Sequence, residues 1–197
     1  PLVAQTAATT APQVVFTSVG PDGWRMRFAP TNLGTLLSSE RGRELWQPGA
    51  LPLVEWLQDR LGSDPHERLL AYGGRIRLGI WLQEGDLGEQ GPFAAALVLE
   101  GDGRTDLQAL AGDLEKLQTE AGGEWSDVEV GGRSLRVLTQ GMDRMTAPIV
   151  GENHLLCVAA AVDELAAAMA TAQAFAGTCD GKPPKPDAPA LAIDVAT

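Results

Sequence analysis

Apolar and polar positions repeat with two different periods along this chain. Alternation at every second position, with β-branched residues and short turns, predicts strands. The strand-like segments are 13–19, 24–28, 76–82, 93–99, 128–130, 133–138, 145–150, 154–160 and 190–195. Most of them pair with a neighbour across a short turn, and Gly131-Gly132 supplies the positive φ that a type I′ turn requires. The sequence therefore predicts a series of β-hairpins.

Apolar residues spaced by three or four positions predict helices between these hairpins. The helical segments are one from Thr31, one over 52–61, joined to the first by Trp46-Gln47-Pro48-Gly49, and then 64–72, 105–121 and 163–175. Capping boxes are expected where Asp64 precedes Glu67 and where Thr105 precedes Gln108. Runs of hairpins and helices, without strict βαβ alternation, are typical of antiparallel sheets packed against helices.

The predicted fold class is therefore α+β, with an antiparallel sheet of about seven to nine strands packed against four to five helices. We expect residues 1–12 to form a flexible N-terminal segment and 13–179 a single domain. Residues 180–188 read as a proline-rich linker and 189–197 as a terminal strand. Because Ala188 to Asp194 echoes Ala11 to Phe16, this strand is also interpreted as the start of a second unit in a longer parent chain.

Charge and hydropathy limit the partners. The 197 residues carry a net charge of -11, which repels nucleic acid and anionic lipid. No apolar run approaches the roughly 20 residues that cross a bilayer, so no membrane span is expected. The small, apolar and hydroxyl residues of 1–12 are typical of the region that follows a removed export signal.

One stretch carries a resemblance to a known group of proteins. Thr31-Asn32-Leu33-Gly34-Thr35-Leu36-Leu37-Ser38-Ser39, followed by Leu45-Trp46, resembles the start of large exported bacterial proteins built on a domain of unknown function. The resemblance implies export, with a periplasmic or secreted location, and tandem organisation. It supplies no catalytic residues.

The two cysteines lack the short spacing of a zinc or redox site. Cys157 follows a predicted strand and Cys179 a predicted helix. Two interpretations stay open, namely a disulfide between them and a pair of buried free thiols.

Catalytic and metal-binding patterns are weak. The histidines, His66 and His154, have no nucleophile motif beside them, and both are interpreted as ordinary polar residues. The acidic turn 100–106 has Arg104 where a calcium loop needs an oxygen ligand, so a strand-to-helix turn explains it better. We therefore expect no cofactor, no metal and, most simply, no enzymatic activity.

Two features are candidates for interaction. The acidic loop 84–91 holds Asp86 and Glu89, which could face a basic partner. Among the tryptophans, Trp46 stands beside Pro48-Gly49 and is the one most expected to be exposed, where indole makes a strong contact. The others are expected at or near the core.

The functional prediction is a non-enzymatic, exported protein-interaction or structural module of an extracytoplasmic assembly. Its partner would be another protein or further domains of the same chain. The alternatives are a domain that binds a glycan or lipid and, less favoured, a hydrolase that uses paired carboxylates.

Overall fold

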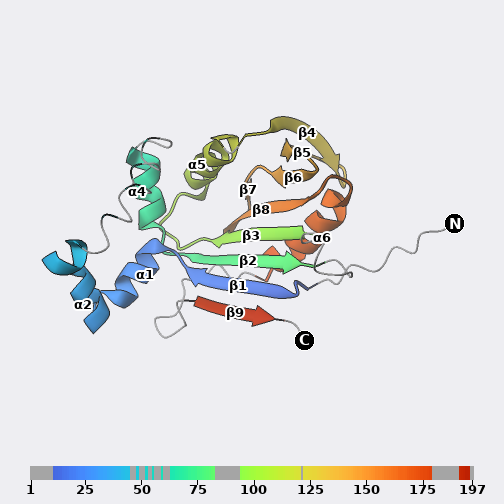
Figure 1. Cartoon of the computed structure of the whole chain (residues 1–197). Coiled ribbons are helices and arrows are strands. Elements are labelled where there is room, and N and C mark those ends of the chain that lie inside the picture. The colour runs from blue at the N-terminus through green and yellow to red at the C-terminus, as the bar shows by residue number, and fades with distance from the viewer. Residues whose placement is uncertain are drawn as a thin grey trace.

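The computed structural model describes residues 11–44, 48, 52, 55, 59, 63–82, 94–120, 122–178 and 191–195 (Figure 1). Its first half contains β1 (Val14–Val19), α1 (Pro21–Phe28), α2 (Asn32–Ser38), α4 (Ser63–Ala71), β2 (Arg75–Trp81), β3 (Ala94–Glu100) and α5 (Leu107–Glu120). The second half contains β4 (Glu124–Val130), β5 (Arg133–Gln140), β6 (Asp143–Thr146), β7 (Ile149–Val150), β8 (His154–Ala161), the 3₁₀ turn η1 (Val162–Glu164), α6 (Leu165–Ala176) and β9 (Leu191–Val195). No helix in the described part is long and apolar enough to cross a membrane.

The described strands form one nine-stranded antiparallel sheet, which confirms the α+β prediction. The strand order is β4-β5-β6-β8-β3-β2-β1-β9, and the short β7 also pairs with β8. The predicted last strand is present as β9, which pairs with β1 at one edge of the sheet. The strand formed by 191–195 therefore belongs to the same sheet as the rest of the unit.

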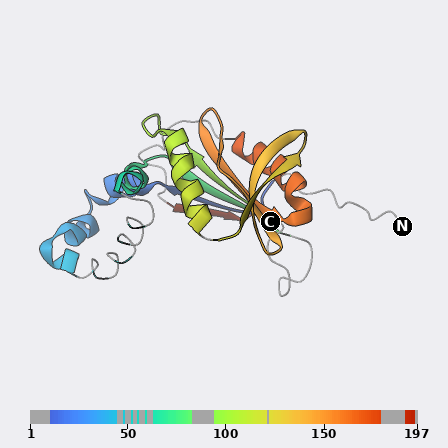
Figure 2. The ribbon, with the colours of Figure 1, turned by 90° about the horizontal axis from the view of Figure 1, so that it is seen from above.

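The pleat of the strands gives the sheet two faces. One face carries Trp81, Ala96 and Val158, and α6 packs on it around Phe175 to form the larger core. The other face is covered at one end by α5, where Leu110 packs with neighbours from the sheet in a second core. Figure 2 shows the sheet between α5 and α6, with α1 and α2 beyond one end of the strands.

One sequence prediction is wrong at the start of the chain. Residues 24–28 were expected to form a strand, but they belong to α1. Pro21 occupies the first turn, where its fixed φ suits a helix and its missing N–H is not needed. Trp24 then stacks on Phe28 with ring centroids 5.0 Å apart, a contact between positions i and i+4 that a helix favours and that an extended strand cannot make.

The helical region after Thr31 agrees with the prediction where the structure describes it. Thr31 caps α2, because its Oγ1 accepts a hydrogen bond from the Gly34 backbone N–H at 3.0 Å. Residues 40–44 are also helical, as are residues 48, 52, 55 and 59, which are all exposed. The expected cap at Asp64 lies outside the described side chains.

The helix predicted over 105–121 is present as α5, but its cap is shifted by one residue. Asp106, and not Thr105, accepts hydrogen bonds from the backbone N–H groups of Gln108 (2.9 Å) and Ala109 (3.1 Å). The Thr105 hydroxyl donates instead to Asp102. Asp and Thr are both favoured at the cap position, so the sequence alone does not separate the two.

The later hairpins match the prediction in type and differ in detail. Gly131 and Gly132 both have positive φ (59° and 78°), as a type I′ turn requires. The single strand expected over 145–150 is divided into β6 and β7, which are separated by residues 147–148. Pro148 has no N–H to donate, which explains why pairing stops there.

Candidate functional site

Most of the residues that the sequence singles out for interaction fall outside the described residues. Trp46, Asp86, Glu89 and Cys179 are all in this position, so their roles stay predictions. Cys157 is a buried residue of β8, and burial raises the pKa of its thiol to about 12. The thiol is therefore protonated and unreactive near neutral pH.

The strand alternation places Cys157 on the sheet face that α5 covers. It is one residue from Leu156 and Val158, which belong to the core beneath α6 on the opposite face. The described chain after α6 ends at Thr178, which contacts the α6 face through Arg77. The bridge from Cys157 to Cys179 stays a prediction.

The described tryptophans serve packing. Trp81 is buried and meets Phe175 edge to face at 5.8 Å, which confirms a core position. The indole N–H of Trp24 donates to Ser18, and that of Trp125 donates to Thr119, each at 3.0 Å. None of these three indoles forms an open stacking platform.

The acidic turn before α5 is organised by its own hydrogen bonds. Asp102 accepts bonds from the backbone N–H groups of Gly73 (3.1 Å), Arg104 (2.9 Å) and Thr105 (2.7 Å). Partial burial of Asp102 acts to raise its pKa, but these hydrogen bonds outweigh that effect and the pKa is lowered. Among the described residues, no group of three or more His, Cys, Asp or Glu side chains is placed to hold a metal ion.

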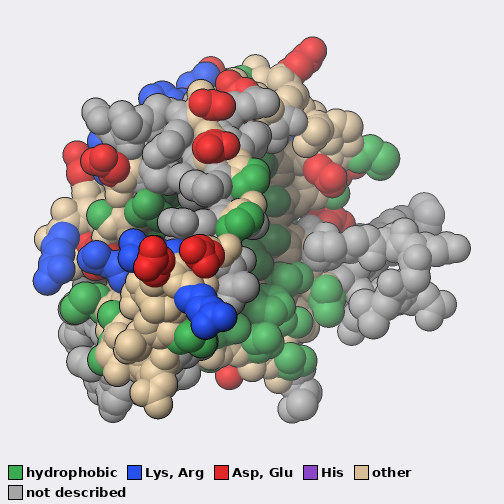
Figure 3. Space-filling view, turned by 60° about the vertical axis from the view of Figure 1, so that its left-hand side comes forward, with side chains coloured by type: hydrophobic (Ala, Val, Ile, Leu, Met, Phe, Trp, Pro, Cys, Tyr) green, Lys and Arg blue, Asp and Glu red, His purple; other side chains and the backbone are tan. Residues whose placement is uncertain are grey.

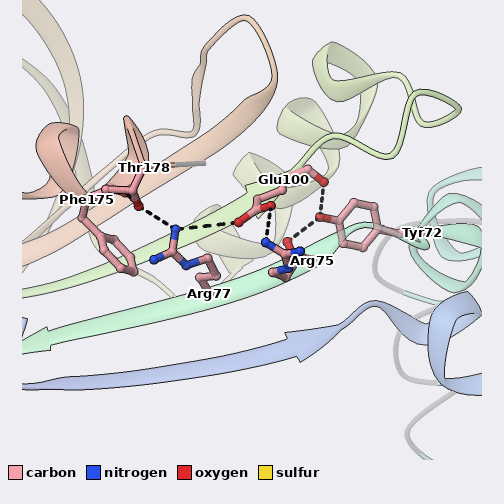
Figure 4. Close-up of polar contacts among 6 residues, drawn as sticks. All are labelled: Tyr72, Arg75, Arg77, Glu100, Phe175 and Thr178. Carbon is pink, nitrogen blue, oxygen red and sulfur yellow. Dashed lines mark hydrogen bonds and ion pairs between the residues drawn. The ribbon is translucent and has the colours of Figure 1, made fainter. Parts of the chain in front are cut away.

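A buried polar cluster lies around Glu100, next to the C-terminal end of α6 (Figure 4). We call it the Glu100 cluster, and its members are Tyr72, Arg75, Arg77, Glu100, Phe175 and Thr178. The Glu100 carboxylate is completely buried. Its Oε2 accepts a hydrogen bond from Arg75 Nη1 at 3.3 Å, and its Oε1 lies 3.8 Å from Arg77 Nη1.

The arginines of this cluster join separate parts of the fold. Arg77 donates to the Thr178 hydroxyl at 2.8 Å, and its guanidinium lies 4.3 Å above the Phe175 ring. The Tyr72 hydroxyl lies 2.7 Å from the Glu100 carbonyl oxygen and 3.0 Å from that of Arg75. The cluster thus ties α4, β2, β3 and the end of α6 together, which is a structural role.

The hydrophobic pattern of the sequence does not reveal this cluster, because Arg75 and Arg77 fit the polar positions of an alternating strand. A stronger signal was available in Glu100, because a carboxylate directly after the apolar run of β3 and next to a strand with two arginines needs a partner.

An exposed apolar surface lies on the other face, where α5 does not reach. We call it the open face, and its members are Val14, Phe16, Leu78, Ile80, Leu191, Ile193 and Val195. The register places these side chains side by side, with Phe16 opposite Leu78 on one flank and opposite Ile193 on the other. The β1 and β2 members are half-buried, whereas Leu191, Ile193 and Val195 are 54%, 56% and 63% exposed. Figure 3 shows hydrophobic side chains gathered along a hollow beside the helical end.

Comparison with protein-family models, with curated proteins and with solved structures finds no match for this chain. The described residues form two surfaces that bear on function, the Glu100 cluster and the open face. Of these, the Glu100 cluster is occupied by its own contacts, and the open face exposes the apolar side chains of β9.

Proposed function

We propose that this chain is a non-enzymatic protein-interaction module whose contact surface is the open face. The observation that carries the proposal is the exposure of three adjacent apolar side chains on β9, Leu191, Ile193 and Val195, in line with the apolar side chains of β1. Burying a Leu, Ile or Val side chain stabilises a contact by about 1.5–3 kcal/mol. Contiguous apolar surface of this kind is typical of interaction sites.

The chemistry of the surface favours a protein over the other classes of partner. The net charge of -11 opposes association with nucleic acid or an anionic membrane. A glycan site needs aromatic platforms with polar groups around them, and the described members of the open face include one aromatic ring, Phe16. An aliphatic surface on a β-sheet fits the apolar side chains of another polypeptide.

Export and an extracytoplasmic location belong to the same proposal. They are supported by the sequence of residues 1–12 and by the resemblance of the Thr31–Ser39 stretch to exported bacterial proteins. In such a location the module would bind other proteins of a larger assembly and would catalyse no reaction itself. Fractionation of the native cells tests the location directly.

The contact surface is tested by a photo-crosslinking amino acid placed at residue 193 in the native host. We expect covalent protein adducts at this position. Met142 is the matched control, because it is an apolar residue that is 84% exposed on a turn away from β9. Equal adducts at both positions, or none at residue 193, would contradict the proposal, and an adduct with the mass of a lipid or glycan would favour the ligand-binding alternative.

A further inference from the structure

The two strands at the edge of the sheet share a sequence pattern. Ala11-Pro12-Gln13 precedes β1, and Ala188-Pro189-Ala190 precedes β9. Each strand begins two residues after its proline, at Val14 and at Leu191. Counting from these starts, Phe16 is equivalent to Ile193, and both strands place apolar residues at their first and third positions.

The pairing of these strands has the symmetry of a strand with its own copy. Phe16 lies opposite Ile193, its equivalent. Val14, the first position of β1, lies opposite Val195, the fifth of β9, and Ser18, the fifth of β1, lies opposite Leu191, the first of β9. An antiparallel pair of two identical strands related by a two-fold axis has this reciprocal register.

The side chains obey the same symmetry. Residues opposite each other in an antiparallel pair point to the same face, so Leu191, Ile193 and Val195 lie on the open face with Val14 and Phe16. Their sequence equivalents in β1 lie on that face too. A two-fold axis perpendicular to the sheet preserves the face in this way.

We propose that β9 occupies the position beside β1 that the β1 strand of a second copy of this unit takes in an assembly. The β1 edge is then the place where two copies join. The inference rests on the proposed function, names the partner as the same kind of unit, and adds the β1 edge beside the open face as the place where the two units join. At the joint, two sheets become one, with the axis passing at Phe16. The open face then continues from one unit onto the next.

Removal of β9 from the β1 edge should expose that edge to a second chain. The backbone N–H and C=O groups of β1 would then be unpaired, and an unpaired edge is a template for another strand. Two chains should associate through β1 about Phe16, and the molecular mass should double from 20.7 kDa.

The test releases β9 in the full chain with Ala192→Pro and Ile193→Pro together. Consecutive residues of a strand point their N–H groups to opposite sides, so either residue 192 or residue 193 donates a hydrogen bond to β1. Replacing both by proline removes that bond in either case. Circular dichroism verifies that the rest of the fold is intact. Analytical ultracentrifugation then measures the mass.

Cysteine reporters measure the register, in a background with Cys179→Ser. In the symmetric pair, residue 16 faces residue 16 of the other chain at about 4.5–5.5 Å between Cα atoms, so Phe16→Cys should form a disulfide-linked dimer. Thr17→Cys is the matched control. Its two copies are offset by two residues, at about 8 Å, too far for a disulfide.

The expected result is a dimer cross-linked at position 16 and not at position 17, and only when the prolines release β9. A folded proline variant that stays monomeric, or equal cross-linking at both positions, overturns the inference. Adducts at residue 193 in cells, together with a monomeric proline variant, would overturn this inference alone and keep the proposed function with a different protein as partner.

A second variant gives an answer even if the prolines prevent folding. The five residues of β9 are replaced by the first five of β1, Val-Val-Phe-Thr-Ser. The inference expects the urea midpoint of the parent chain, because the β1 sequence suits that place. A control with the same five residues shifted by one position turns the apolar side chains to the wrong face and should lower the midpoint. Equal loss in both chains overturns the inference.

Discussion

Replacement of the buried carboxylate by an amide, Glu100→Gln, tests the role of the Glu100 cluster. Glu100 is fully buried between Arg75 and Arg77, whose side chains are 29% and 18% exposed. At an effective dielectric constant of about 20, charges 3.3 and 3.8 Å apart attract by about 4–5 kcal/mol each. Desolvation of the carboxylate offsets several kcal/mol of this attraction.

The attraction and the desolvation together decide how far Glu100→Gln lowers the free energy of unfolding. Removing one partner of a buried ion pair costs about 3–5 kcal/mol. Because both arginines keep some contact with water, we expect the lower end, a fall of about 3 kcal/mol in the free energy of unfolding measured with urea. Glu115→Gln is the control, since its pair with Arg136 is partly exposed and should contribute at most about 1 kcal/mol. A Glu100→Gln protein within about 1 kcal/mol of the parent would refute the reasoning.

Two further perturbations test the same region. Asp102→Asn should lower the free energy of unfolding by about 2 kcal/mol near neutral pH, because the amide weakens charge-assisted bonds. Since the folded pKa of Asp102 lies below its unfolded value of about 3.9, its stabilisation is present above that pH and is lost as the pH falls through the folded pKa. Urea unfolding from pH 7 to 3 should therefore show parent and variant converging, and a constant difference would contradict this. Gly74→Ala should lower the free energy of unfolding by about 3 kcal/mol, because the new Cβ would lie 2.1 Å from the Glu100 carbonyl oxygen. Gly112→Ala should raise it by about 1 kcal/mol, because Gly112 lies on α5 with open space around it. Thermal unfolding should therefore show a lower melting temperature for the first variant and a higher one for the second.

The sequence predicted the α+β class and most strands because their signals are local. Gly131-Gly132 specifies its turn through backbone conformation alone, and the spacing of Leu107, Leu110 and Leu114 specifies a helix. The prediction failed at Trp24–Phe28, where every second residue is apolar and where Pro21 and a stacked ring pair favour the helix instead.

The Glu100 cluster and the open face could not be predicted in the same way. Both depend on which strands lie side by side, and a pattern along one strand does not give its neighbours. Arg77 and Thr178 are 101 residues apart in sequence, yet they form a hydrogen bond in the fold. The partnership of β1 with β9 is likewise a product of the strand order.

β9 lies at the edge of the sheet and lacks the usual protection of an edge strand on its open-face side. Natural edge strands are protected by charges, prolines or bulges, because an exposed apolar edge invites pairing with another chain. Within Leu191–Val195 the one charged residue, Asp194, alternates with the open-face side chains and so lies on the other face. Its charge therefore does not protect the three apolar side chains, which are each more than half exposed. This composition fits the proposal that β9 occupies the position of the first strand of a second unit, because such a position is an inner strand of a joined sheet and needs no protecting charge.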